Sequence, residues 1–234
     1  MKVQTILLGL VVALYLFSGC VFGSGRITSE SREVSEFSGV ILKSQGNVTI
    51  NEGETFEVVV TTDDNMHEFF DTKVDANGRL IISKNFWMWI QPSRLNINIT
   101  TPSMNYIILN GAGNISSTHE FSGNSMYIGL SGAGNISAKA DVINLDANLS
   151  GAGNITITGT AENQSVNLSG AGNYKAFSLM SSDGSISLSG AGNCEVNVST
   201  DLDVYLSGFG DVKYRGYPAV SKTVTGFGSV RSDN

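Results

Sequence analysis

Charged residues, histidine, cysteine and proline are all scarce in this sequence of 234 residues. Lysine, arginine, aspartate and glutamate together make up 15% of the chain, which has two histidines, two cysteines and three prolines. Two distant thiols cannot form a metal-binding set, and no disulfide is needed. The net charge is −7, and no cluster of lysine and arginine occurs after the N-terminal apolar run. Both features argue against binding of nucleic acid and against electrostatic docking on anionic lipid.

Long helical patterns are also missing outside the N-terminus, and a short motif recurs instead. The motif reads Leu-Ser-Gly-Ala-Gly-Asn followed by an aliphatic residue, with variations, and its copies are separated by 18 to 21 residues. Such a period is typical of stacked-repeat architectures. The first glycines of the copies are Gly111, Gly132, Gly151, Gly170, Gly190, Gly208 and Gly226.

The positions that flank this motif are apolar in every copy. The residue two before the first glycine is leucine or valine, and the residue four after it is aliphatic, tyrosine or Cys194. Around them apolar and polar residues alternate, as expected for strands with one buried face. We therefore predict an all-β fold: a β-solenoid, or single-stranded β-helix-like stack, of repeats of about 19 residues. Each repeat should hold a strand, a tight glycine corner, a second strand and a looser return.

One polar column follows the second glycine of the motif. Stacked asparagine side chains can hydrogen-bond to one another from coil to coil, so we interpret this column as a structural ladder at the corner. The alternative is a row of sugar or ion ligands. The column consists of Asn114, Asn135, Asn154, Asn173, Asn193 and Asp211.

The N-terminus resembles an export signal. Residues 1–19 combine Lys2 with an apolar run, and the Leu-Phe-Ser-Gly-Cys sequence that ends at Cys20 resembles a lipoprotein box, in which the cysteine is acylated. The alternative is an uncleaved anchor over residues 6–22. Either anchor predicts a location outside the cytoplasm, with the membrane as a partner.

Three further regions follow the export signal. We expect a polar tether at residues 20–36, an N-terminal β region at residues 37–103 that caps one end, and the repeat solenoid at residues 104–234. Residues 40–50 look like a degenerate early copy of the motif, and Asn77-Gly78 predicts a hairpin turn.

Both tryptophans, Trp87 and Trp89, lie in one aromatic segment before Pro92. Two interpretations stay open. The segment is a core strand or a plug for the solenoid end, or it is an exposed patch that contacts a partner, a glycan or the membrane surface.

These features together resemble the GIN-domain family, which is labelled as auto-transporter adhesin head domains. The resemblance is carried by the Phe-Ser-Gly-Val sequence at residues 37–40, the Asn77-Gly78 hairpin, the repeated motif and the Tyr-Arg-Gly-Tyr-Pro sequence at residues 214–218. It implies a β-helix-like fold and a secreted or surface-anchored location, and it supplies no catalytic residues.

No pattern in the sequence predicts an active site, a cofactor or a metal. His67 and His119 are interpreted as surface histidines, and the glycine turns lack the helix that a phosphate-binding loop needs. The acid pairs Asp141 with Asp146 and Asp201 with Asp203 are interpreted as solvated loop residues rather than as a glycosidase pair. The acids at positions 63, 64 and 71 match no calcium motif.

We therefore predict a membrane-anchored, extracytoplasmic, non-enzymatic surface protein that serves as an adhesin or binding scaffold. A glycan or an envelope protein is the expected partner, and nucleic acid is not. The alternatives are a structural or sensing component of the cell envelope and, less favoured, a polysaccharide-cleaving solenoid enzyme.

Overall fold

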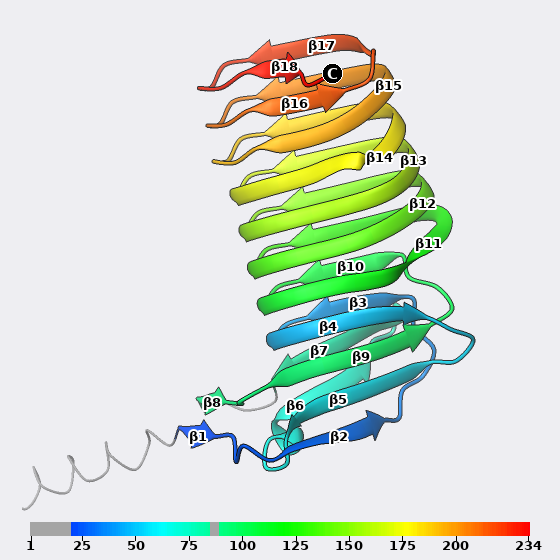
Figure 1. Cartoon of the computed structure of the whole chain (residues 1–234), viewed down its shortest axis with the longest axis vertical. Coiled ribbons are helices and arrows are strands. Elements are labelled where there is room, and N and C mark those ends of the chain that lie inside the picture. The colour runs from blue at the N-terminus through cyan, green and yellow to red at the C-terminus, as the bar shows by residue number, and fades with distance from the viewer. Residues whose placement is uncertain (1–19, 85–88) are drawn as a thin grey trace, which may run out of the picture.

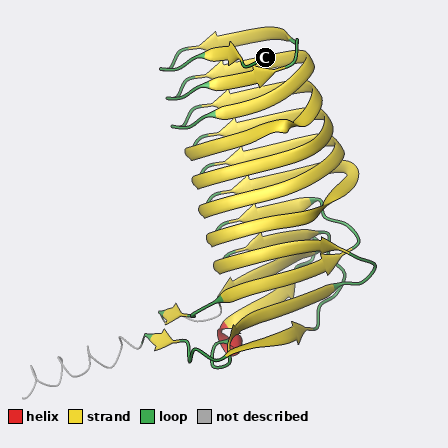
Figure 2. Cartoon of the chain, in the orientation of Figure 1, coloured by secondary structure: helices red, strands yellow, loops and turns green. Residues whose placement is uncertain are grey.

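The computed structural model describes residues 20–84 and 89–234 and is nearly all β (Figure 1; Figure 2). Its helical content in these ranges is one short 3-10 helix, η1 (His67–Phe69). No helix among the described residues is long and apolar enough to cross a bilayer. Trp87 and the predicted export signal at residues 1–19 lie outside the described residues.

The centre of the molecule is a stack of coils, each made by one long strand. These strands pair in parallel with their neighbours along almost their whole length. The predicted looser return is instead part of the same strand, which bends with only local shifts of register, as between Ser116 and Glu120. The strands are β11 (Ala112–Leu130), β12 (Ala133–Leu149), β13 (Ala152–Leu168), β14 (Ala171–Leu188) and β15 (Cys194–Leu206).

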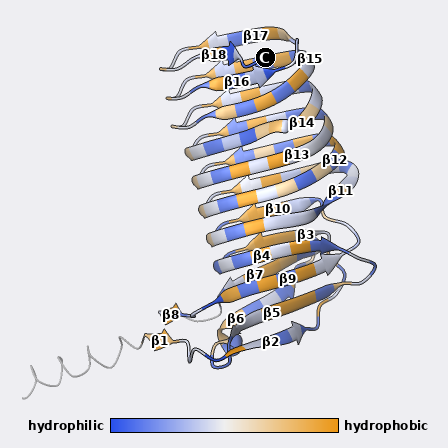
Figure 3. Ribbon diagram, in the orientation of Figure 1, coloured by the Kyte–Doolittle hydropathy of each residue, from blue (hydrophilic) through white to orange (hydrophobic). Residues whose placement is uncertain are grey.

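The register between coils places like residues above one another, as the sequence predicts. Leu130 pairs with Leu149 and Leu149 with Leu168, and all three side chains are buried. Figure 3 shows the resulting alternation of apolar and polar bands along each coil. Burial of one apolar column after another supplies the main stabilisation, because no coil could bury its apolar face alone.

The N-terminal β region continues this stack without a break. β3 (Gly39–Leu42) pairs in parallel with β10 (Tyr106–Leu109), and β4 (Gln45–Glu52) pairs in parallel with β11. Beneath them, β7 (Arg79–Lys84) pairs with β3, and β9 (Leu95–Thr101) pairs with β4. Residues 40–50 therefore do form an early coil, as the degenerate motif predicts.

Antiparallel strands close the N-terminal end of the stack. β5 (Glu57–Asp63) pairs with β9 and with β2 (Ile27–Arg32), and β6 (Phe70–Val74) pairs with β7 through the Asn77-Gly78 turn. Gly78 has a φ of 68°, which suits glycine at this turn. β2 lies within the stretch that the sequence assigns to a tether, so that part of the chain is an ordered strand of the cap.

Short strands form the two remaining parts. β1 (Val21–Phe22) pairs with β8 (Ile90–Gln91) beside the cap. At the other end, β16 (Val212–Arg215), β17 (Ala219–Val224) and β18 (Val230–Ser232) continue the parallel pairing, and β17 is largely exposed.

Candidate binding surface: the glycine corner and its aromatic ends

The Gly-Ala-Gly-Asn motif forms the sharp corner of each coil, and we call the line of these turns the glycine corner. A Cβ placed on Gly132 would overlap the carbonyl oxygen of Gly111, and one on Gly134 would overlap that of Gly113. Gly134 also has a φ of 144°, where side chains are strained. Only glycine lets successive corners approach this closely, which explains why both glycines recur.

The predicted asparagine column runs along this corner as a chain of hydrogen bonds. Asn135 donates from Nδ2 to Oδ1 of Asn114 at 2.9 Å, and Asn154 donates to Asn135 at 2.8 Å. Asn173, Asn193 and Asn114 donate in the same way to the asparagine of the coil before them, the last of these to Asn47. Because these amides satisfy one another, the contacts favour the structural interpretation over a row of free ligands.

Asp211 ends the asparagine ladder. Its backbone N–H donates to Oδ1 of Asn193 at 3.0 Å, and its own carboxylate accepts from the hydroxyl and the N–H of Ser229. The hydroxyl of Ser229, with smaller contributions from its N–H and from Arg231, lowers the pKa of Asp211 despite partial burial. The carboxylate therefore serves the structure of the last corner.

The residue between the two glycines projects outward at every corner. It is an exposed alanine in five copies and phenylalanine in the last two. Phe209 and Phe227 are 64% and 77% exposed, and their rings stack with centroids 5.3 Å apart and an interplanar angle of 11°. The sequence reasoning assigned these rings no role, although the change from alanine to phenylalanine at a turn tip was the available signal.

A second aromatic group lies at the foot of the glycine corner. Trp89 is 83% exposed and Phe22 is 63% exposed, and the two are joined through β1 and β8, where the Val21 N–H donates to the Trp89 carbonyl at 2.9 Å. Residues 92–95, which follow β8, share a shallow hollow with residues 45–47 of the first corner. Trp89 is thus part of an exposed patch rather than of the core. Cys20, which directly precedes β1 in the chain, is exposed as well.

Asp63 holds the two segments that carry Phe22 and Trp89 against the cap. Its fully buried carboxylate accepts from the Gly25 N–H at 2.8 Å and from the Ser93 N–H at 2.7 Å. Burial raises the pKa of Asp63, but these hydrogen bonds outweigh it and hold the pKa below its ordinary value. Both oxygens are used by backbone amides. In the described ranges, no three histidine, cysteine or acidic side chains are placed to hold a metal ion.

The expectation that His67 is a surface residue is wrong. His67 is buried, because β2 lies over it, and its Nε2 lies 2.9 Å from Thr28 Oγ1 while its Nδ1 lies 3.4 Å from a Glu30 oxygen. His119 is exposed at the bend opposite the glycine corner, and its Nδ1 lies 2.9 Å from Thr118 Oγ1. The two histidines belong to different parts of the structure and form no joint site.

The acid pairs are exposed, and only one of them is brought together. Asp201 and Asp203 line a shallow groove on the solenoid face together with Asp146 and Asp183. Asp141 lies at the bend instead, where its carboxylate accepts from the Thr160 hydroxyl. The expectation that these four acids lie in loops is wrong, because Asp141 and Asp146 lie on β12 and Asp201 and Asp203 lie on β15.

Comparisons with known proteins agree with this architecture. Residues 36–218 match the family model described as "Putative auto-transporter adhesin, head GIN domain". No curated protein matches the chain significantly.

Several solved structures share the fold. A crystal structure described as a putative adhesin from Bacteroides fragilis has a TM-score of 0.85 and 22% identity over 91% of this chain and 99% of its own. One described as a putative lipid binding protein from Parabacteroides distasonis has a TM-score of 0.75 and 22% identity over 92% of this chain and 100% of its own. A putative adhesin from Parabacteroides merdae has a TM-score of 0.69 and 18% identity over 92% of this chain and 99% of its own. At these identities the likeness supports the fold alone.

Proposed function

Because the chain belongs to the family of GIN domains of auto-transporter adhesin heads, we propose that it is a membrane-anchored, non-enzymatic binding scaffold outside the cytoplasm. The observation that carries this proposal is the uninterrupted parallel stack from β9 to β16. Such a stack repeats each outward position at about 4.8 Å intervals on long, rigid faces. A surface of this kind suits an extended partner better than it suits a reaction that needs converging groups.

The connection between the anchor and the solenoid supports membrane attachment. Cys20 is exposed, and two residues separate it from Gly23, after which the chain is held to the cap by Asp63 and by the pairing of β2 with β5. A lipid on Cys20 would therefore hold a rigid body close to the membrane, rather than through a long flexible tether.

The anchor is tested by comparing Cys20→Ala with wild-type protein in fractionated cells. We expect wild-type protein in the membrane fraction, with incorporation of labelled fatty acid, and the variant in the soluble extracytoplasmic fraction. Cys194→Val is the matched control, because Cys194 is buried in a column that has valine at positions 212 and 230. Retention of Cys20→Ala in membranes would favour an uncleaved anchor instead.

The binding role is tested with the anchored protein on cells. We expect cells that carry it to retain glycans from an array or to adhere to a glycan-coated surface, whereas cells that express the released Cys20→Ala variant should not. Pull-down of other envelope proteins, with no glycan or surface binding, would favour the structural or sensing role.

Lipid is a further candidate ligand class. One solved structure with this fold is described as a lipid binding protein, and the exposed aromatic side chains at both ends of the glycine corner offer apolar contacts.

The polysaccharide-cleaving alternative is tested with the double variant Asp201→Asn and Asp203→Asn. Release of reducing ends by the wild type that this variant lacks would overturn the non-enzymatic proposal.

A further inference from the structure

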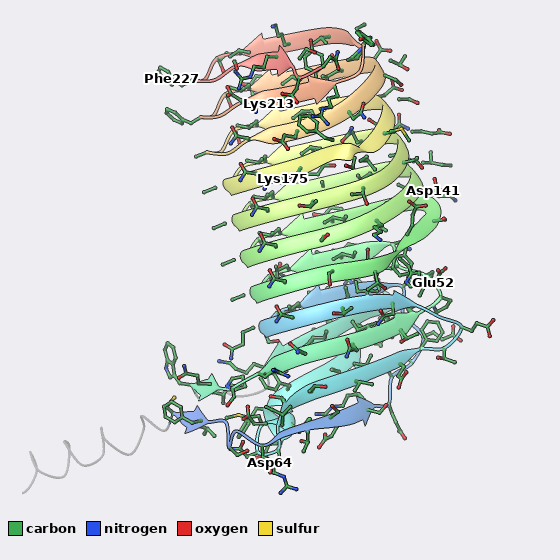
Figure 4. The ribbon with its side chains drawn as sticks, viewed as in Figure 1. Glu52, Asp64, Asp141, Lys175, Lys213 and Phe227 are labelled. Atoms are coloured by element: carbon green, nitrogen blue, oxygen red, sulfur yellow. The ribbon has the colours of Figure 1, made fainter. Side chains whose placement is uncertain are left out.

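Large exposed apolar side chains occur at both ends of one edge of the solenoid. Phe209 and Phe227 project from the last two glycine corners, and Phe22 and Trp89 are exposed at the foot of the same edge. Figure 1 shows β1 and β8 on the side of the molecule to which the corners point, and Figure 4 shows Phe227 projecting from that side. From the corner at Gln45 to that at Phe227 there are seven steps of about 4.8 Å, or roughly 34 Å in all.

The turns in the middle of the edge between these aromatic ends carry no formal charge, while the exposed Lys43 and Arg94 lie at its foot and Asp211 at the corner of Phe209. From the corner at Gly111 to the corner at Gly190, the turn residues are serine, glycine, alanine and asparagine. The opposite bend is acidic and includes Glu52 and Asp141, which Figure 4 shows on the side away from Phe227, as well as the exposed Glu120 and Glu162. Transfer of charge toward the hydrocarbon region is costly, so the glycine corner, whose charges lie near its two ends, could rest on a membrane at lower cost than the acidic bend.

The geometry of the phenylalanine pair favours insertion over stacking on a sugar. Because the rings of Phe209 and Phe227 are stacked at an interplanar angle of 11°, each covers one face of the other. The pair therefore leaves at most one face of each ring for stacking on a sugar, whereas all of the exposed ring surface can make apolar contact with lipid. Tryptophan and phenylalanine that project from a polar frame are typical of groups that enter the membrane interface.

We infer that the glycine corner lies along the membrane surface, with Phe22 and Trp89 at one end and Phe209 and Phe227 at the other in contact with lipid. The inference rests on the proposed anchoring, because Cys20 precedes Phe22 by two residues and would place its lipid at the foot of the same edge. The solenoid then lies on its edge beside the bilayer, with the acidic bend toward solvent. The net charge of the protein does not draw it to the membrane; apolar contacts and the lipid anchor provide the binding.

The test uses the full acylated chain in phosphatidylcholine and phosphatidylethanolamine vesicles, some made with acyl-brominated phosphatidylcholine. Phe227→Trp and, separately, Phe209→Trp are introduced with Trp87→Phe and Trp89→Phe, so that each protein has one tryptophan. Tyr217→Trp in the same background is the matched control, because Tyr217 is 90% exposed and lies at the opposite bend. We expect brominated lipid to reduce the emission of both corner reporters at least about twofold and to leave the control unchanged.

Flotation of the vesicles separates the two proposals. If the protein floats with the vesicles and neither corner reporter is quenched more than the control, the edge-on arrangement is wrong, while the anchor proposal holds. The glycine corner would then face solvent, where a soluble partner could bind it. If the wild-type protein does not float, the anchor proposal fails and the inference fails with it.

Discussion

Lys222 on β17 pairs in register with Val204 on β15. Val204 is buried in an inward column of the solenoid, so Lys222 places a charged residue at a position that is apolar one coil below. Its Nζ reaches across the coil and donates to the Val230 carbonyl at 3.4 Å. Inward charge is one way in which natural sheets prevent another chain from adding to an edge.

Lys222→Val should therefore make this end of the solenoid associate with other copies of the chain. With Val220 and Val224 on the same strand, the substitution creates an inward row of three valines at a largely exposed edge. We expect concentration-dependent self-association in sedimentation velocity, whereas Thr223→Val, at an outward position paired with the exposed Tyr205, should sediment as the wild type. Equal behaviour of the two variants would show that Lys222 does not protect the edge.

The register of the stack predicts a large difference between two substitutions in β12. Leu149→Ala removes a buried side chain from the leucine column and should lower the free energy of unfolding by about 2–5 kcal/mol. Asn144→Ala removes an exposed amide that accepts a hydrogen bond from Asn163, and it should change the free energy of unfolding little. Similar shifts of the two denaturation midpoints would contradict the coil register.

Much of this architecture could be predicted from the sequence because each coil obeys the same local rule. A glycine turn, an inward leucine and an inward aliphatic residue recur together, and parallel stacking is the arrangement that buries them all. The same reasoning identified residues 40–50 as an early coil and the Asn77-Gly78 hairpin. It also placed Cys194 inside, where burial raises the pKa of its thiol.

The parts that escaped prediction depend on contacts between distant residues. His67 is buried because β2 crosses over it, and nothing near His67 in the sequence shows that cover. The outward direction of Phe209 and Phe227 follows from the corner geometry, while their stacking follows from the spacing of the coils. The exposure of Trp89 depends in the same way on how β8 pairs with β1.

Acid should release the fastening of the N-terminal segment that Asp63 provides. Because the pKa of Asp63 is lowered in the folded protein, its stabilising contribution is complete above the unfolded-state pKa of about 3.9 and is lost as the pH falls through the lower folded-state value. Asp63→Asn should therefore lower the melting temperature at pH 7, and the gap from wild type should narrow toward pH 2. A gap of constant size across this range would show that ionisation of Asp63 is not what holds Gly25 and Ser93.

The close approach of the corners predicts opposite results for two glycine-to-alanine substitutions. Gly134 has a φ of 144° and no room for a Cβ beside the Gly113 carbonyl, so Gly134→Ala should cost about 1–3 kcal/mol from backbone conformation alone, before the clash is added. Gly123 lies in β11 at the opposite bend with nothing within 4 Å of an added Cβ. Gly123→Ala should be neutral or stabilise the fold by up to about 1 kcal/mol, because it restricts the unfolded chain. Denaturant unfolding of the two variants measures both effects, and tolerance of alanine at position 134 would mean that the corners are spaced more widely than this stack requires.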